Sequence, residues 1–410
     1  MSFDTLTELS RQFVGQLTRQ KRRQLPVPLS GHRHLLTGSR GTGKSTWTAQ
    51  YLVEKFPDYK KSTECLYLPA DHFQLAGRSL YEVAEVFVRR GGRLLCLDEV
   101  HRAENWSQDL KSLADTFPNL EILATGSSLL HLQKGSHDLS RRFLVHTLEG
   151  LSLREYLELK YEKVLPPLTL SELLKKHEAI SQDITNELAS LGKPILALFE
   201  EYLRAGYYPY AFELENTQAY TQTLQQSMQA SLEGDLPAIY PNMSGASIKR
   251  IRRLLAAIAG NVPFTPDFSR MRRRLQIADD RTLKDYLSLL EDARLIRILR
   301  RQGTPMGSMD KPDRIYLGDP NLAYALSDPR LPERGAIRET FFLSNLPTQS
   351  DARGAPRGDF LINDTYTVEV GGRHKDADQI RDLPDAYLAI DDIEHGSSQR
   401  IPLWLFGFLR

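Results

Sequence analysis

The chain has 410 residues, of which 41% are hydrophobic and 26% are charged, and its formal net charge is +1. This length and composition exclude a disordered chain and predict several domains with apolar cores. The balanced charge excludes a global attraction to nucleic acid or membranes, so such a partner must be met by a local patch. The chain has two cysteines, no secretory signal pattern and no apolar run of membrane-spanning length. We therefore expect a cytoplasmic protein without a membrane partner.

The first predicted element is an amphipathic helix over residues 4–24, which Pro26 and Pro28 end. Its apolar side chains recur at helical spacing and are Leu6, Leu9, Phe13, Val14 and Leu17. We expect this helix to pack on the edge of the domain that follows.

A glycine-rich loop follows the apolar run of residues 34–37 and opens the next helix. The loop consists of Gly38, Ser39, Arg40, Gly41, Thr42, Gly43, Lys44, Ser45 and Thr46. This spacing is typical of a phosphate-binding loop, in which backbone N–H groups and the positive end of the helix dipole face the phosphates of a nucleotide. Lys44 is predicted to neutralise phosphate charge, and the Ser45 hydroxyl is predicted to bind Mg²⁺.

From residue 32 to about residue 150, predicted strands alternate with helices, which indicates a parallel sheet covered by helices on both faces. The expected strands are His34–Thr37, Glu64–Pro69, Arg93–Leu97 and Glu121–Ala124, with helices opening at Lys44 and near Leu80–Arg90. The third strand runs into Asp98 and Glu99 at the sheet edge where ligands bind. Asp98 would hold Mg²⁺ through water, and Glu99 would polarise the attacking water. A protein that only binds nucleotide needs just the first carboxylate, so the pair indicates hydrolysis.

Polar side chains at Thr125–Ser128 end the fourth strand and reach the same sheet edge. Thr125 or Ser127 is predicted to sense the γ-phosphate or to hold the attacking water. Arg141 and Arg142 follow, just before another strand-like run. An arginine in that place can reach the γ-phosphate of a neighbouring subunit and stabilise charge in the transition state. The alternative is that the two arginines are an exposed charge pair.

Residues 151–235 have a helical pattern and are interpreted as a lid or spacer. Residues 247–317 have the pattern of a winged helix, in which three helices are followed by a β-hairpin. Basic residues are dense in this second region: Lys249, Arg250, Arg252, Arg253, Arg270, Arg272, Arg273, Arg274, Arg281 and Lys284. They suit contact with DNA phosphates. Its acidic residues would repel DNA: Asp279, Asp280, Asp285, Glu291 and Asp292. DNA contact and a structural or protein-contacting role therefore both stay open.

The last hundred residues have the pattern of another small α/β unit. A helix over residues 337–346 carries Glu339, a strand begins at Asp359, and the next strand carries Glu369, with a turn at residues 363–364. Three acidic groups in this arrangement are able in principle to collect Mg²⁺ for phosphodiester cleavage.

Taken in order, these motifs resemble the prokaryotic AAA+ ATPases of the archaeal-ATPase-like branch. The matching residues are Gly38–Thr46, Leu95–His101 with Trp106, Thr125–Ser128, Ser140 and Arg141, Leu151–Tyr156, Gly206–Pro209 and Ile315–Asp319, leading to Glu339, Asp359 and Glu369. The resemblance implies an α/β fold with a P-loop NTPase sheet, a helical lid, a winged helix and a small restriction-endonuclease-like domain. Its domains would be residues 1–150, 151–240, 241–320 and 321–410.

By this resemblance Lys44, Ser45, Asp98 and Glu99 form a catalytic ATP and Mg²⁺ site, Thr125 or Ser127 is a sensor, and Arg141 is a candidate arginine finger. The family often has glycine where this chain has Ser140. An arginine finger used in trans would require a homo-oligomer, which Arg141 alone does not establish.

The nuclease-like pattern wants a lysine two residues after Glu369, and this chain has Gly371 there and Lys375 four positions further on. We therefore predict that the C-terminal domain is inactive. The function that we expect is a Mg²⁺-dependent ATP hydrolase that switches how its winged-helix and C-terminal modules are presented to a partner. The alternatives are an ATP-gated DNA nuclease and a nucleic-acid-binding adaptor with slow ATP turnover.

Overall fold

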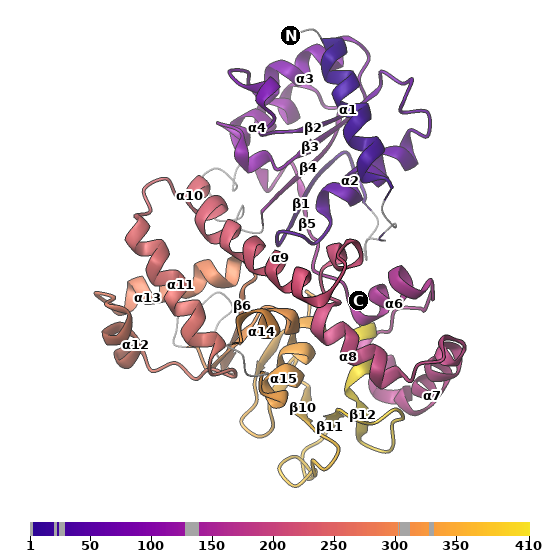
Figure 1. The fold of residues 1–410 in the computed structure, drawn as a ribbon, viewed down its shortest axis with the longest axis vertical. Helices are drawn as coiled ribbons and strands as arrows, with labels where there is room; N and C mark the ends of the chain where they lie inside the picture. The colour runs from indigo at the N-terminus through magenta and orange to yellow at the C-terminus, as the bar shows by residue number, and fades with distance from the viewer. Residues whose placement is uncertain are drawn as a thin grey trace. The chain divides into compact units, whose positions relative to one another are not determined.

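The apolar segments in the first third of the chain form a sheet of five strands, each parallel to its neighbours. In sheet order they are β2 (Cys65–Pro69), β3 (Leu94–Asp98), β4 (Glu121–Ser127), β1 (Arg33–Gly38) and β5 (Leu144–Thr147) (Figure 1). The predicted parallel sheet is confirmed. Strand β4 continues three residues beyond the predicted end, and it lies between β1 and β3. Strand β1 leads into the glycine-rich loop and β3 ends at Asp98. The ends of these two strands therefore lie on either side of the end of β4.

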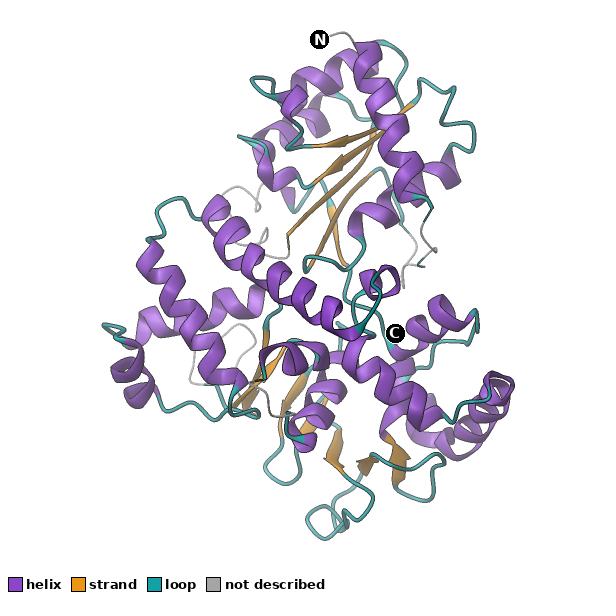
Figure 2. Ribbon diagram, viewed as in Figure 1, coloured by secondary structure: helices purple, strands orange, loops and turns teal. Residues whose placement is uncertain are grey.

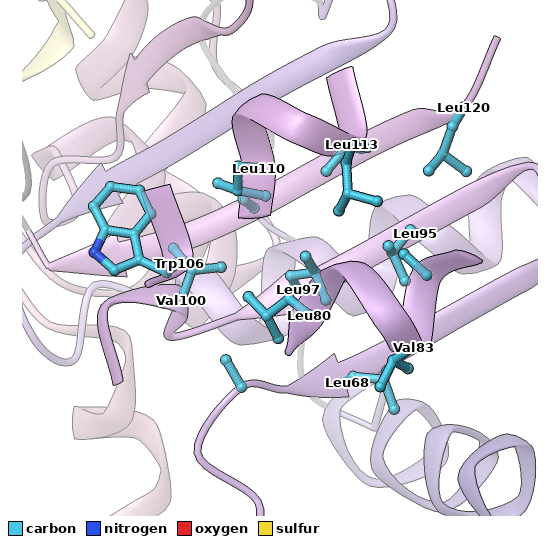
Figure 3. Packing of buried hydrophobic residues seen from close by; sticks show 14 of the residues in the cluster. Leu68, Leu80, Val83, Leu95, Leu97, Val100, Trp106, Leu110, Leu113 and Leu120 are labelled. Atoms are coloured by element: carbon cyan, nitrogen blue, oxygen red, sulfur yellow. The ribbon is translucent and has the colours of Figure 1, made fainter. Parts of the chain in front are cut away.

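Helices cover both faces of this sheet, as expected for buried parallel strands. On one face α3 (Leu80–Arg89) and α4 (Trp106–Thr116) pack on Leu95 and Leu97, while on the other α2 (Lys44–Lys55) packs on Leu94 and Cys96. Figure 3 shows Leu95 and Leu97 packed together with Trp106 and other side chains of the first face. Successive strand residues point to opposite faces, so a continuous apolar run supplies two cores.

The N-terminal helix α1 (Phe3–Leu17) packs against the edge strand β2 and against α2. Its Ser10 hydroxyl accepts a hydrogen bond from the Tyr67 N–H at 2.8 Å, which satisfies a backbone donor of the edge strand. The expected packing on the domain edge is confirmed, whereas the helix ends earlier than the predicted residue 24. Pro26 and Pro28 lie outside the described residues.

The computed structural model describes residues 3–19, 23, 29–127, 139–301, 303, 312–327 and 332–410. The chain divides into two compact units, residues 1–150 with 230–243 and residues 151–229 with 244–410. The first unit therefore contains a late segment of the chain, including a π-helical turn at Ser231–Asp235 and the helix α10 (Leu236–Ile239). No helix in the described parts of the chain is both long and apolar enough to cross a membrane.

The second unit combines helices with a mixed seven-stranded sheet (Figure 2). Its helices are α6 (Leu153–Tyr161), α7 (Leu170–Leu188), α8 (Ile195–Ala205), α9 (Thr217–Ala230, whose last residue belongs to the first unit), α11 (Gly245–Ala259), α12 (Phe268–Leu275), α13 (Asp280–Asp292), α14 (Pro320–Leu326) and α15 (Arg334–Asn345). In sheet order its strands are β12 (Arg400–Pro402), β11 (Ala386–Ile390), β10 (Tyr366–Gly371), β9 (Phe360–Ile362), β8 (Ala352–Gly354), β6 (Ile296–Arg301) and β7 (Arg314–Leu317).

The helices α11, α12 and α13 are followed by the antiparallel pair β6–β7, in the order predicted for a winged helix. Strand β6 also pairs in parallel with β8, so this pair and the C-terminal strands form one continuous sheet. Strands β9 and β10 form the predicted hairpin, with positive φ at Asn363 and Asp364 as a tight turn requires. The finer division into four domains stays a prediction.

Candidate active site

The glycine-rich loop joins β1 to α2 and wraps around the side chain of its lysine. Gly43 precedes the helix with a φ of 90°, a left-handed conformation that favours glycine. At Gly38 a Cβ atom would lie 2.3 Å from the carbonyl oxygen of Leu148, so this position has room only for glycine. The Lys44 Nζ donates hydrogen bonds of 3.0 Å to the carbonyl oxygens of Gly38 and Ser39. The lysine is thus held at the loop where phosphates are expected.

Three carboxylates act on the buried Lys44 ammonium. Burial lowers the pKa of Lys44, while the negative charges of Glu99, Asp98 and Asp235 oppose that shift. Asp98 and Glu99 were predicted to lie at this end of the sheet. Asp235 was not predicted, because it comes from the segment 230–243, which folds into the same unit.

Hydroxyl groups surround the buried Asp98 carboxylate. Thr125 donates a hydrogen bond to its Oδ1, and the Tyr67 phenol donates one of 2.7 Å to its Oδ2. Burial and the charge of Asp98 raise the pKa of Tyr67, so this phenol keeps its proton. A polar contact with the Ser45 side chain opposes the shift in the pKa of Tyr67. A carboxylate with nearby hydroxyl oxygens is a donor set that fits Mg²⁺, which prefers oxygen ligands.

The polar end of β4 contacts the Asp98 side chain and the Glu99 backbone. The Thr125 hydroxyl accepts a hydrogen bond of 3.1 Å from the Glu99 N–H, in addition to the one it donates to Asp98. The Ser127 N–H donates to Nδ1 of His101 at 3.4 Å. Thr125 is thereby placed to respond to both acidic residues, and its role as a sensor stays a prediction. Ser128 lies outside the described residues.

Glu99 has a left-handed backbone conformation, with φ of 54° and ψ of 44°. This conformation is uncommon for a residue with a side chain, and such strain is concentrated at functional sites. The Glu99 side chain is 26% exposed, whereas Asp98 is buried. The more accessible carboxylate is therefore the one predicted to meet water.

Sequence reasoning missed an ion pair beside Glu99. Arg102, from the turn after β3, donates a hydrogen bond to Oδ1 of Asp235. Burial raises the pKa of Asp235, but the polar contact with His101 and the charges of Arg40 and Arg102 outweigh burial and bring the pKa below its ordinary value. Asp235 is therefore ionised at neutral pH. Nothing in the local sequence around Asp235 signals this role, since its partners are more than a hundred residues away.

A second missed residue is Arg23, whose buried side chain supports the glycine-rich loop. Its Nη1 donates to the carbonyl oxygens of Thr42 at 3.1 Å and Glu149 at 2.6 Å, and its Nη2 donates to that of Gly150 at 3.0 Å. Arg23 therefore ties the loop to the chain just after β5. In the sequence it is one of several basic residues in a short run, which gave no signal.

The two arginines after β4 have different surroundings. Arg142 binds Asp115 with two hydrogen bonds, of 2.6 Å from Nε and 2.9 Å from Nη2. Arg141 is exposed, and so is Arg40 in the glycine-rich loop. Arg141 is therefore the more available of the pair, and its assignment as an arginine finger stays a prediction.

The three acidic residues of the C-terminal sheet have basic neighbours. Arg314 lies 3.1 Å from Oδ1 of Asp359 and 3.8 Å from Oε2 of Glu339, and Lys375 lies 2.5 Å from Oε1 of Glu369. The turn after β10 thus brings Lys375 back to Glu369. The alternation of side chains along a strand does not by itself predict this contact. Among the described residues, no group of three or more histidine, cysteine, aspartate or glutamate side chains is placed to hold a metal ion. The absence of nuclease activity stays a prediction.

The parallel sheet, the loop around Lys44 and the acidic end of β3 together define a P-loop NTPase domain of the AAA class. In agreement with this, residues 32–157 match the family described as AAA domain (AAA_14). That part of the chain is an AAA-type ATPase domain. Residues 196–332 match a family described as a domain of unknown function (DUF8612).

The chain is also similar to two solved structures. One is the Aeropyrum pernix ORC1 protein in complex with DNA, at 12% identity and a TM-score of 0.31, covering 80% of this chain and 92% of that one. The other is AMPPCP-bound DnaA from Aquifex aeolicus, at 13% identity and a TM-score of 0.25, covering 70% of this chain and 88% of that one. No curated protein matches the sequence.

Proposed function

We propose that the protein is a Mg²⁺-dependent ATP hydrolase. The observation that carries this proposal is the placement of Asp98 and Glu99 where both charges act on the Lys44 ammonium. Binding alone requires the lysine and one carboxylate, whereas hydrolysis also requires a group that orients water.

Each side chain has a part in this reaction. Lys44 leaves the carbonyl oxygens of its own loop and binds the β- and γ-phosphates. Glu99 orients the attacking water in line with the γ-phosphate. Ser45 and Asp98 would hold Mg²⁺, which neutralises charge on the phosphates. Thr125 links Asp98 to the Glu99 backbone, so it adjusts both when nucleotide binds.

We further propose that hydrolysis acts as a switch that changes how the second unit is presented to a partner. Support comes from the chain path: the segment 230–243 belongs to the first unit, and the chain on both sides of it belongs to the second. Asp235 lies in this segment and its charge acts on Lys44. When nucleotide binding moves the Lys44 ammonium, the electrostatic interaction of Asp235 with it changes. Asp235 lies in a segment whose two ends continue into the second unit.

The test compares Glu99→Gln and Lys44→Ala with the wild-type protein. Glu99→Gln is expected to bind ATP with unchanged affinity in calorimetry and to release phosphate at least a hundredfold more slowly, because the water loses its base. Lys44→Ala is expected to lose ATP binding. Glu104→Gln, an exposed glutamate near the same turn, is the matched control and should behave as wild type. Phosphate release by Glu99→Gln at the wild-type rate would refute the role of Glu99.

A second candidate function is nucleic-acid binding through the basic helices of the second unit. Lys249, Arg253, Arg270, Arg273 and Arg274 are exposed on α11 and α12. Arg272 is instead engaged by Asp280, at 2.7 Å between Nε and Oδ1. The exposed cations suit contact with phosphates, while exposed acidic residues on α13 oppose it.

The variant Arg273→Glu with Arg274→Glu tests this second candidate. Its DNA binding, measured at several salt concentrations, should be weaker than that of wild type and less dependent on salt, because fewer counterions are released. The matched control is Lys175→Glu with Lys176→Glu, an equal charge change on the exposed surface of α7. Equal losses in both variants would show a nonspecific charge effect and would count against a DNA-binding face on α12.

A further inference from the structure

The imidazole of His101 is completely buried beside the proposed catalytic glutamate, with a side-chain exposure of 0%. Its Nδ1 accepts a hydrogen bond of 3.4 Å from the Ser127 N–H. A neutral imidazole that accepts at Nδ1 carries its proton on Nε2. The strand β4 therefore selects the tautomer of His101 that donates from Nε2.

Two carboxylates face this Nε2–H group. The nitrogen lies 3.5 Å from Oε2 of Glu99 and 3.8 Å from Oδ1 of Asp235. Neither distance makes a hydrogen bond, and among the described residues Nε2 has no hydrogen-bond partner. A buried donor without a partner is unfavourable. A small movement of the Glu99 carboxylate toward the ring would satisfy it.

The two carboxylates that face Nε2 differ in burial and in their other contacts. Asp235 is buried, and its Oδ1 is held by the Arg102 guanidinium. Glu99 is partly exposed, and its backbone already has an uncommon conformation. The imidazole therefore stands between an anchored carboxylate and one whose orientation is still to be set. Catalytic hydrogen bonds that are long without substrate often shorten when the reacting complex forms.

We propose that His101 is a positioning residue that donates a hydrogen bond from Nε2 to Glu99 and so orients the carboxylate toward the attacking water, with Asp235 fixing the ring from the other side. This inference rests on the proposed ATP hydrolysis. His101 itself touches neither the water nor the phosphates. Its effect is to hold Glu99 in the geometry that the reaction requires, and a displacement of about 1 Å in such a group costs roughly a hundredfold in rate.

The test replaces His101 with one residue that donates a hydrogen bond and one that does not. His101→Leu fills similar space without a donor, and its kcat should fall at least about tenfold while KM for ATP stays within about twofold of wild type. His101→Gln restores an amide donor, and its kcat should recover to within about threefold of wild type. A role in core packing alone would give the opposite order, because a buried site without a hydrogen-bond partner tolerates leucine better than the polar glutamine.

Two further variants define the partners of His101. In the Glu99→Gln background, His101→Leu should cause no additional loss of single-turnover rate, because the group that it orients is already inactive. Asp235→Asn keeps the size of the side chain and removes the anchoring charge, so it should lower kcat. This variant also carries the test if His101→Leu fails to bind ATP and is therefore misfolded.

His177→Leu is the matched control. His177 is a buried histidine of α7, and neither of its ring nitrogens has a hydrogen-bond partner among the described residues. Its replacement should leave ATP turnover unchanged. Wild-type turnover in His101→Leu, or an equal loss in His101→Leu and His101→Gln, would overturn the positioning role while leaving the hydrolase intact. A wild-type protein that binds ATP without hydrolysing it would overturn the proposed function and this inference with it.

Discussion

In the first unit, Asp98 accepts hydrogen bonds from the neutral hydroxyls of Thr125 and Tyr67, whereas in the second unit Asp359 and Glu369 are each paired with a cationic side chain. Both regions place carboxylates on or next to β-strands: Asp98 ends β3, Asp359 directly precedes β9, and Glu369 lies within β10. The sequence motifs for the two looked alike, since each suggested Mg²⁺ chemistry. The partners of the carboxylates are what differs.

This difference matters because a carboxylate binds a metal ion only if its charge is available. The threonine and tyrosine hydroxyls orient Asp98 without neutralising it. A cation whose charge acts on Asp98 is the Lys44 ammonium. In the proposed reaction Lys44 turns to the phosphates, so a divalent cation still gains from binding Asp98. The guanidinium of Arg314 and the ammonium of Lys375 already neutralise charge in the C-terminal cluster. A cation must first displace them, and this cost favours an inactive nuclease-like site over an active one.

The largest expected effect is on the hydroxyl-bound carboxylate. Asp98→Asn keeps the shape of the side chain but removes the charge that would hold Mg²⁺, so ATP turnover should fall at least about a hundredfold. Phosphate release over a range of Mg²⁺ concentrations measures this effect. Asp58→Asn, at an exposed aspartate of the same unit, is the control. Full turnover by Asp98→Asn would remove the contrast between the two clusters.

A smaller effect is expected from the arginine that supports the phosphate-binding loop. Arg23→Ala leaves the carbonyl oxygens of Thr42, Glu149 and Gly150 without this donor. The free energy of unfolding should fall by roughly 2 to 4 kcal/mol, because a buried charged hydrogen-bond donor is lost. Denaturant unfolding measures the change. Arg33→Ala, which removes a single exposed hydrogen bond to Pro118, should change stability much less. Equal losses of stability in the two variants would argue against a role of Arg23 in supporting the loop.

In the C-terminal cluster, the raised pKa of Glu339 leads us to expect that stability depends on pH. Burial and the neighbouring charge of Asp359 raise the pKa of Glu339 from 4.5 to about 7. The folded protein thus keeps a proton that the unfolded chain loses between these values, so the free energy of unfolding falls as pH rises through this window. At pH 8 the ionised Glu339 is expected to cost roughly 1 to 3 kcal/mol.

Glu339→Gln removes this titration and keeps an oxygen that can accept the Tyr316 hydroxyl, which donates to Glu339 at 2.8 Å. The variant should be more stable than wild type at pH 8, with the difference closing toward pH 4. Urea unfolding at several pH values measures this. Glu215→Gln, at an exposed glutamate, should leave the pH profile unchanged. A Glu339→Gln variant less stable than wild type at pH 8 would contradict the raised pKa.

For the nuclease-like cluster we expect no DNA cleavage, and therefore no effect of substitutions on cleavage. Incubation of the wild-type protein with plasmid DNA, Mg²⁺ and ATP should produce no cleavage, and Asp359→Ala should be indistinguishable from it. Digestion that disappears in Asp359→Ala and Glu369→Ala would instead establish the ATP-gated nuclease. It would also show that Arg314 and Lys375 yield to the metal ion.

Much of the proposed ATP site was predictable, because its signals are local. The glycine spacing before Lys44 predicts the phosphate-binding loop. The apolar run before Asp98 indicates a buried strand that ends at acidic residues. The order of the strands was not predictable in this way. Thr125 contacts the Asp98 carboxylate and the Glu99 N–H because β4 is the neighbour of β3. No local pattern encodes that strand order.

The amino-acid sequence by itself determined the phosphate-binding loop, the paired carboxylates, the parallel α/β class and the tight turn at residues 363–364, since each depends on backbone preferences and side-chain periodicity over a few neighbouring residues. Only the tertiary structure decided that Arg23 supports the loop, that the charge of Asp235 acts on Lys44 and that Lys375 reaches Glu369. These contacts join residues through the packing of separate elements. Their free energy depends on burial and distance, which become defined only when the chain is folded.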